Sequence, residues 1–71
     1  MPSFEKLTSI IKEHRPKADL DLVKLAYDYA QKAHQGQNRF SGEPYFNHAV
    51  GTAEILAENR ADLATIIAGL L

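Results

Sequence analysis

The stretch GQNRFSGEPYFNH, residues 36–48, lies between two segments with helical patterns and indicates where the chain turns. Gly36 and Gly42 predict changes of direction, because glycine adopts positive φ angles at little cost. Pro44 suits the start of a helix, since its fixed φ matches helical geometry and its missing N–H is not needed there. The stretch therefore predicts a polar loop that leads directly into a helix with His48 near its N-terminus.

Four side chains of this stretch differ in chemistry and lie close together in the sequence. Arg39 offers a planar guanidinium and Ser41 a hydroxyl. Tyr45 and His48 follow with a phenol and an imidazole. Binding residues are found disproportionately on loops that a rigid scaffold holds in place. We therefore interpret the loop and the start of the next helix as a binding site.

Apolar residues recur every three or four positions on both sides of the loop, which predicts an all-α fold. Ser3, Asp19 and Asp62 stand before these apolar segments and are suitable N-caps. Pro16 limits the first segment, because proline disfavours helix in the residue before it, and Gly36 suits the end of the second. We expect a bundle of about four helices, spanning residues 4–14, 20–35, 45–58 and 63–71.

The same spacing predicts which side chains face the core. The expected inward residues are Phe4, Leu7, Ile10 and Ile11 in the first helix, Leu22, Val23, Ala26, Tyr29 or Ala30, and Ala33 in the second, and Tyr45, His48, Thr52, Ile55 and Leu56 in the third. The last segment is apolar on most sides, which favours a helix covered by its neighbours.

The composition excludes several classes of protein. With 71 residues, the chain forms one small domain or part of a larger one. It has no cysteine, so it offers neither disulfides nor thiolate ligands for zinc. A net charge of -1 with intermixed signs gives no indication of nucleic-acid binding. Residues 1–5 lack a signal-peptide pattern and no apolar run suits a membrane span, so we expect a soluble cytoplasmic protein without membrane partners.

The three histidines allow different interpretations. We expect His14, at the end of the first helix, to be a surface residue without chemistry, and His34 to hydrogen-bond the loop and hold its shape. An inward-facing His48 could be a core residue with satisfied hydrogen bonds, or a metal ligand, since a helix N-terminus disfavours imidazolium. One histidine cannot hold a catalytic metal, so further ligands would have to come from elsewhere.

Residues 33–48, AHQGQNRFSGEPYFNH, closely resemble the pattern AH-x-GQ-x-R-x-SGEPY-x-x-H of the Rel/SpoT homologue hydrolase domain. The resemblance extends from near Leu22 to the end of the chain. Two positions differ from the family. Phe40 stands where many members have lysine, and Ala49 follows the histidine where proline is usual.

This resemblance implies that the chain is an incomplete N-terminal portion of an HD-type fold. The complete domain in the family is a Mn²⁺-dependent hydrolase of the stringent response, which removes pyrophosphate from the 3′ position of the guanine nucleotides ppGpp and pppGpp. His48 matches its first metal ligand. The resemblance implies that the nucleotide-binding positions are Arg39, Phe40, Ser41 and Tyr45.

The remaining metal ligands of the family, a His-Asp doublet and a more distant aspartate, would follow Leu71. The resemblance therefore assigns no catalytic residue within residues 1–71. It implies that this fragment alone neither binds Mn²⁺ nor hydrolyses a nucleotide. The parent protein is expected to be a bifunctional synthetase/hydrolase. Two alternatives stay open: a degenerate, non-catalytic regulatory module of a (p)ppGpp synthetase, or another HD-type nucleotide phosphohydrolase.

The apolar side chains near the C-terminal end also bear on assembly. In a fragment they would lack the cover that later helices supply, and exposed apolar patches of this kind recruit partners. We therefore expect a homo-oligomer, with a two-fold dimer as its simplest form. The expected interface consists of Leu63, Ile66, Ile67, Leu70 and Leu71.

Overall fold

The computed structural model describes residues 2–71, so Met1, which the expected domain includes, lies outside the described residues. Its helices are α1 (Phe4–His14), α2 (Leu20–Ala33), α3 (Tyr45–Glu58) and α4 (Leu63–Leu70). Within the described residues there is no strand, apart from one isolated bridge between Asn38 and Pro44. The prediction of an all-α fold of about four helices is confirmed.

Three of the four helices begin with the predicted side-chain cap. Ser3 Oγ accepts a hydrogen bond from the Lys6 N–H at 3.1 Å. Asp19 and Asp62 act in the same way, each accepting from the backbone N–H three residues later, at 3.1 Å and 2.8 Å. These bonds satisfy N–H groups that have no partner inside the helix, which is why the caps can be read from the sequence.

Helix α2 ends earlier than predicted, at Ala33 instead of Gln35. His34 is its C-cap, and its backbone N–H donates to the Ala30 carbonyl at 2.9 Å. The Gln37 side chain donates from Nε2 to the Ala33 carbonyl at 3.3 Å. Because the loop supplies this bond to the end of the helix, residues 34 and 35 form a turn instead of a further helical turn.

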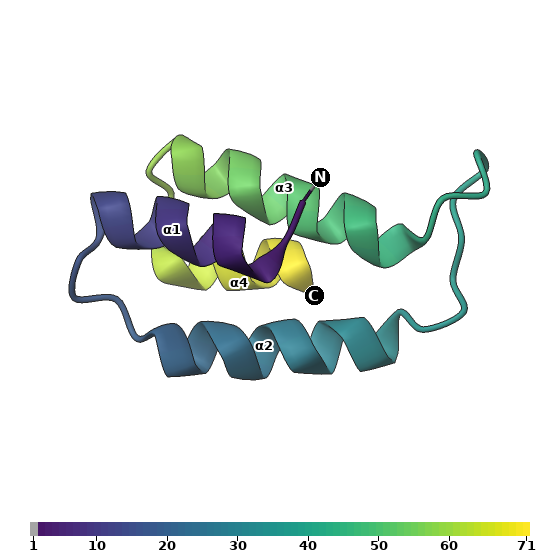
Figure 1. The fold of residues 1–71 in the computed structure, drawn as a ribbon, viewed down its shortest axis with the longest axis horizontal. Coiled ribbons are helices and arrows are strands. Elements are labelled where there is room, and N and C mark those ends of the chain that lie inside the picture. The colour runs from purple at the N-terminus through teal and green to yellow at the C-terminus, as the bar shows by residue number, and fades with distance from the viewer. Residues whose placement is uncertain (1) are drawn as a thin grey trace.

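The four helices are not packed equally against one another. In Figure 1, α1 and α4 lie between α3 and α2. Helix α3 packs chiefly against α4 and α1, and α2 packs against the same two helices. The polar loop between α2 and α3 extends beyond the bundle at one end (Figure 1). The relative position of α2 and α3 therefore depends on the helices between them.

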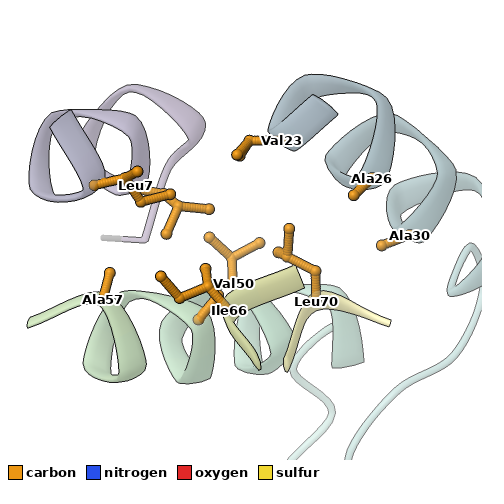
Figure 2. Close-up of a cluster of buried hydrophobic side chains, with 10 residues drawn as sticks. Leu7, Val23, Ala26, Ala30, Val50, Ala57, Ile66 and Leu70 are labelled. Atoms are coloured by element: carbon orange, nitrogen blue, oxygen red, sulfur yellow. The ribbon is translucent and has the colours of Figure 1, made fainter. Parts of the chain in front are cut away.

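The core is built from a few large aliphatic residues and many alanines. The largest fully buried side chains are Leu7, Ile11, Val23, Val50, Ile66 and Leu70. Figure 2 shows most of them converging from all four helices, with alanines of α2 and α3 at the edges of the cluster. Gly69 allows α4 to approach α3 closely, because a Cβ there would lie only 2.8 Å from Leu56 Cδ1.

The predicted inward faces are largely correct for α1 and α2 and mostly wrong for α3, in which Leu56 of the predicted residues is partly buried against the core. Leu7 and Ile11 of α1 are buried, as are Val23, Ala26 and Ala30 of α2, although Leu22 and Ala33 of α2 are exposed. In α3 the buried face instead consists of Ala49, Val50, Ala53, Glu54 and Ala57. The prediction assigned the larger side chains to the core, but α3 approaches its neighbours through alanines, and this turns Tyr45, His48 and Ile55 outward.

An aromatic cluster joins the starts of α1 and α3 to the middle of α2. The Tyr27 ring lies edge-to-face against Phe4, with centroids 5.1 Å apart, and against Phe46 at 4.9 Å. Burial raises the pKa of Tyr27, with smaller contributions from nearby carboxylates. Aromatic pairs in this geometry stabilise a fold by about 0.5–1.5 kcal/mol beyond the area they bury.

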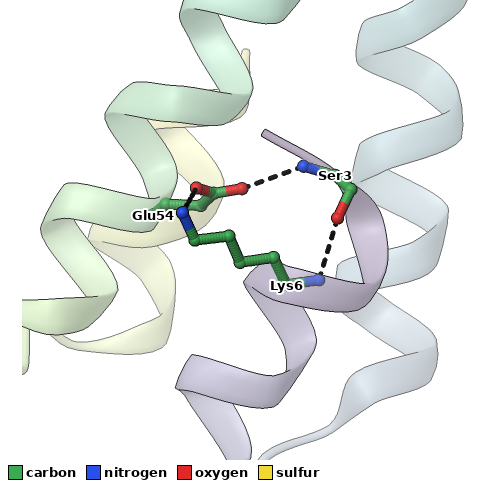
Figure 3. A network of polar contacts seen from close by, with 3 residues as sticks. All are labelled: Ser3, Lys6 and Glu54. Carbon is green, nitrogen blue, oxygen red and sulfur yellow. Dashed lines mark hydrogen bonds and ion pairs between the residues drawn. The ribbon is translucent and has the colours of Figure 1, made fainter. Parts of the chain in front are cut away.

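Glu54 is the one buried charged residue among those described, with 4% of its surface exposed. Its Oε2 accepts a hydrogen bond from the Ser3 N–H at 3.0 Å, and its Oε1 lies 3.6 Å from Lys6 Nζ (Figure 3). A helix N-cap N–H is often satisfied by a glutamate three residues later in the same helix. That position in α1 is Lys6, so a carboxylate from α3 takes the role instead.

The expected oligomer interface needs revision. Ile66 and Leu70 are 1% and 0% exposed within a single chain, because α4 packs them against the other helices. Leu63 and Ile67 are partly buried, and Leu71 remains more than half exposed. Ile66 and Leu70 are therefore not available to a second copy, and homo-oligomerisation itself stays a prediction.

Within residues 2–71, no helix combines the length and the hydropathy needed to cross a membrane.

Replacing Glu54 should test the contact between α3 and the start of α1. Glu54→Ala leaves the Ser3 N–H without its acceptor and should lower the free energy of unfolding by about 1.5–3 kcal/mol, as expected for a hydrogen bond to a charged group. Lys6→Ala removes only the ion pair, and since Lys6 is 55% exposed it should cost less than about 1 kcal/mol. Urea unfolding of both variants measures the difference. Equal losses would show that the ion pair, and not the hydrogen bond, dominates.

The Asp62 cap should make stability depend on pH. Hydrogen bonds from Thr65 lower the pKa of this carboxyl in the folded chain. The stabilisation is therefore complete above the unfolded value of about 4 and is lost as the pH falls through the lower folded value. Asp62→Asn, which still caps but does not titrate, should show a smaller loss of stability below about pH 4. Thermal unfolding at several pH values, with Asp21→Asn as the control for an exposed carboxylate, measures this difference.

Candidate functional site

The loop that carries most of the predicted site is held by backbone hydrogen bonds at its base and its tip. At the base, the Tyr45 N–H donates to the Gln37 carbonyl at 2.9 Å. The Arg39 N–H donates to the Glu43 carbonyl at 2.8 Å, and the Gly42 N–H donates back to the Arg39 carbonyl at the same distance. The loop therefore forms a narrow, hairpin-like projection with Arg39 near its tip.

Two glycines make this path possible. Gly36 and Gly42 have φ angles of +81° and +86°, a region that strains any residue with a Cβ. Within the described part of the chain, no atom outside the immediate chain neighbours lies within 4 Å of the position that a Cβ would occupy at either glycine. The requirement for glycine therefore comes from backbone conformation and not from lack of space.

Three of the predicted nucleotide-binding residues lie together at the tip. Arg39, Phe40 and Ser41 are all exposed, and the Phe40 ring is completely open to solvent. Ser41 Oγ accepts a long hydrogen bond of 3.4 Å from the Glu43 N–H. The guanidinium and phenyl groups are thus open to a ligand, but residues 2–71 do not enclose one at the tip.

Tyr45 and His48 lie at the base of the loop, in the first turn of α3. Their rings are in edge-to-face contact with centroids 5.8 Å apart. His48 is exposed, so the prediction that it faces the core was wrong. The neighbouring residues Ala49 and Val50 are buried instead, and they turn His48 to the outer side of the helix. A nitrogen on an exposed imidazole is accessible to a metal ion, whereas a core histidine would be enclosed.

His34 contacts both the loop and the start of α3, in agreement with the prediction that it holds the loop. Its Nδ1 lies 3.0 Å from Gln37 Oε1, and its ring packs against Tyr45 with centroids 5.0 Å apart. Its other nitrogen, Nε2, is buried and has no hydrogen-bond partner among residues 2–71. The sequence did not single out Gln37, although its position one turn after His34 could have indicated the contact.

An open groove lies beside this contact, between the end of α2 and the start of α3. Its volume is about 650 Å³, which is in the range of small-molecule sites. Its lining includes Asp28, Gln31 and Lys32 of α2, His34, Asn38 and Pro44 of the loop region, and Phe46 and Asn47 of α3. Sequence reasoning missed the groove, because it forms only when the two helix ends are brought together.

The described residues do not assemble a metal site by themselves. Among residues 2–71, no three His, Cys, Asp or Glu side chains converge on a position where they could hold one ion. His48 could supply one nitrogen ligand, but these residues do not bring the two or three further ligands of a catalytic site to it. A complete metal site would therefore need groups from outside residues 2–71.

The family model for the HD domain matches residues 26–71. The chain belongs to the HD domain family. The match includes the loop, the His48 region and α4, which are the parts that build and support the candidate site. No solved structure shows a significant match to the chain.

Relatives with curated names are similar along nearly the whole chain. The GTP pyrophosphokinase of Myxococcus xanthus is 46% identical over 69 residues, which cover 97% of this chain. The bifunctional (p)ppGpp synthase/hydrolase RelA of Mycobacterium tuberculosis is 43% identical over 70 residues, 99% of the chain. The bifunctional (p)ppGpp synthase/hydrolase SpoT of Escherichia coli is 44% identical over 68 residues, 96% of the chain. The resemblance to the Rel/SpoT family is confirmed.

These relatives are much longer proteins. The matched region is 9% of the M. xanthus protein and 10% of both the M. tuberculosis RelA and the E. coli SpoT. The HD-family chain therefore spans about a tenth of the length of the curated relatives it matches.

Alanine substitutions at two glycines should have opposite effects on stability. Gly36→Ala forces a Cβ into positive φ and should destabilise the chain by roughly 1–2 kcal/mol. Gly51→Ala, in the middle of α3, meets only Pro2 Cγ at 3.6 Å and should stabilise it by about 0.5–1 kcal/mol. Urea unfolding monitored by circular dichroism measures both changes. A neutral Gly36→Ala would contradict the conformational role of this glycine.

Proposed function

We propose that this chain forms part of a (p)ppGpp 3′-pyrophosphohydrolase of the stringent response, within a bifunctional synthetase/hydrolase. The main support is the similarity of almost the whole chain to relatives with that activity in their names. One of them, from Escherichia coli O157:H7, is named guanosine-3′,5′-bis(diphosphate) 3′-pyrophosphohydrolase and is 44% identical over 68 residues. The exposed His48 beside the loop is compatible with this function, since it leaves a nitrogen free for a metal.

In this proposal the loop binds the guanine base. Arg39 offers a planar, weakly hydrated guanidinium that can stack on a purine, and its exposure at the tip leaves both faces free. Phe40 adds an aromatic surface, and the Ser41 hydroxyl and Tyr45 phenol can hydrogen-bond polar edges of the nucleotide. Because the tip is open, the base would have to be enclosed from its other side by groups outside residues 2–71.

His48 would hold the Mn²⁺ ion of the complete site together with ligands from outside the described residues. A bound metal supplies an activated water and charge stabilisation at the phosphate. The contribution of this chain is to present the imidazole at a fixed point beside the nucleotide-binding loop. The cytoplasmic location expected from the composition accords with a soluble nucleotide substrate and stays a prediction.

A second candidate function is a non-catalytic regulatory module of a (p)ppGpp synthetase. The names of some relatives favour it, because those from Myxococcus xanthus and Mycobacterium leprae refer to GTP pyrophosphokinase activity alone. In such a protein the loop could still bind a nucleotide, but His48 would have no catalytic metal to hold. The two functions differ in whether hydrolysis depends on His48.

The chain of 71 residues alone should not hydrolyse ppGpp. Among its described residues only His48 is a plausible ligand in the site, and a catalytic metal needs about three protein ligands. Incubation with ppGpp and Mn²⁺, followed by chromatography of the products, tests this expectation. Release of pyrophosphate above a control without protein would show that residues 1–71 hold a complete site.

In the full-length protein, His48→Ala and Arg39→Ala should separate metal binding from nucleotide binding. His48→Ala should abolish hydrolysis through loss of Mn²⁺ and leave the fold intact, because the side chain is exposed. Arg39→Ala should retain Mn²⁺ and weaken nucleotide binding by roughly 1–3 kcal/mol, as expected for a lost stacking contact. Calorimetric titrations with Mn²⁺ and with ppGpp measure the two affinities, with Lys12→Ala on α1 as the control.

Hydrolysis that survives His48→Ala would contradict the proposed role of this histidine. A full-length protein that binds ppGpp but never hydrolyses it would favour the regulatory module. Loss of Mn²⁺ in Arg39→Ala, with retention in His48→Ala, would mean that the two roles are assigned to the wrong residues.

A further inference from the structure

His34 is fixed in orientation by the end of α2 and the loop that follows it. The Gln37 amide donates from Nε2 to the Ala33 carbonyl at 3.3 Å, which leaves its Oε1 facing His34 Nδ1 at 3.0 Å. Since an amide oxygen only accepts, Nδ1 must carry the proton of this hydrogen bond. The imidazole is therefore held in one orientation by a side chain that is itself anchored to the helix end.

The other side of the His34 ring makes no polar contact. Among the described residues, no group forms a hydrogen bond with its buried Nε2. The ring instead packs against Tyr45, with centroids 5.0 Å apart and an angle of 48° between the planes. His34 therefore contributes an aromatic surface to the start of α3.

Tyr45 carries this contact on to His48. The two rings meet edge-to-face, with centroids 5.8 Å apart and an angle of 64° between the planes. Tyr45 is 39% exposed, so its ring position depends on the few contacts that it makes, including the one with His34. Within residues 2–71 no hydrogen bond orients the His48 ring, and the residue is exposed. Without the Tyr45 ring beside it, an exposed side chain of this kind would exchange freely among its rotamers.

We propose that His34 is a positioning residue, which fixes the rotamer of His48 through the ring of Tyr45. Three successive contacts then connect the end of α2 to the candidate metal ligand: Gln37 to His34, His34 to Tyr45, and Tyr45 to His48. The link between this fixed rotamer and metal binding rests on the proposed function, because a metal-ligating imidazole must present its nitrogen in a defined direction. The arrangement itself is a property of the chain and can be tested without metal or nucleotide.

NMR of the 71-residue chain provides the test, through the three-bond couplings between the Hα and the two Hβ protons of His48. In a helix χ1 is near 180° or −60°, and either rotamer alone gives one large and one small coupling, whereas exchange between the two makes the couplings nearly equal. The unmodified chain should show unequal couplings. His34→Asn keeps a donor close to the position of Nδ1 but removes the ring, so the couplings should become nearly equal.

His34→Phe is the matched variant, because it keeps an aromatic ring against Tyr45 and removes the hydrogen bond to Gln37. It should retain the unequal couplings. His14→Asn, at the end of α1, is the control for a histidine outside the site and should change nothing. Should His34→Asn fail to fold, Tyr45→Leu breaks the same chain of contacts at a partly exposed residue and should also average the couplings.

Two results would overturn the proposal: averaged couplings in the unmodified chain, or unequal couplings that persist in a folded His34→Asn or Tyr45→Leu variant. Neither result depends on hydrolysis, so the proposed function would remain open to its own test. In the full-length protein, the positioning role further predicts that His34→Asn weakens Mn²⁺ binding by about tenfold or more, and that His34→Phe has a smaller effect. A loss of hydrolysis with unchanged Mn²⁺ affinity and unchanged couplings would also contradict positioning.

Discussion

Burial of Ile66 and Leu70 is the constraint on which the rest of the structure depends. Both side chains lie in the core, on a helix of only eight residues, and this helix packs against both α2 and α3. Since α2 and α3 share much less contact with each other, α4 together with α1 sets the distance between them. At Gly69, α4 comes close to the α3 backbone, because a Cβ there would lie 3.7 Å from Ala53 Cα.

The geometry of the candidate site depends on this packing of α2 and α3 against the helices between them. Its base joins the end of α2 to the start of α3, so the groove and the contact between His34 and Tyr45 exist only while both helices keep their places. Glu54 adds a second restraint from the middle of α3, because it binds the start of α1 through Ser3. A buried carboxylate in the middle of α3 thus supports the scaffold that carries the loop.

Local signals in the sequence predicted more of this structure than signals that depend on packing. Caps and glycine turns act within a few residues, and Ser3, Asp62 and Gly36 could therefore be recognised directly. The orientation of α3 could not, because its core face is made of alanines and the pattern of large residues pointed to the opposite side. For the same reason His48 was expected inside and lies outside. The role of Glu54 depends on residues 51 positions apart, which no local pattern reveals.

The complete exposure of Phe40 has a consequence for how this family can vary. A side chain that adds nothing to the core can be exchanged with little effect on folding, so the scaffold does not constrain this position. If the loop binds a nucleotide as proposed, substitutions there act on the ligand and not on the scaffold. Residue 40 is therefore a place where ligand preference could evolve without compensating changes elsewhere in the chain.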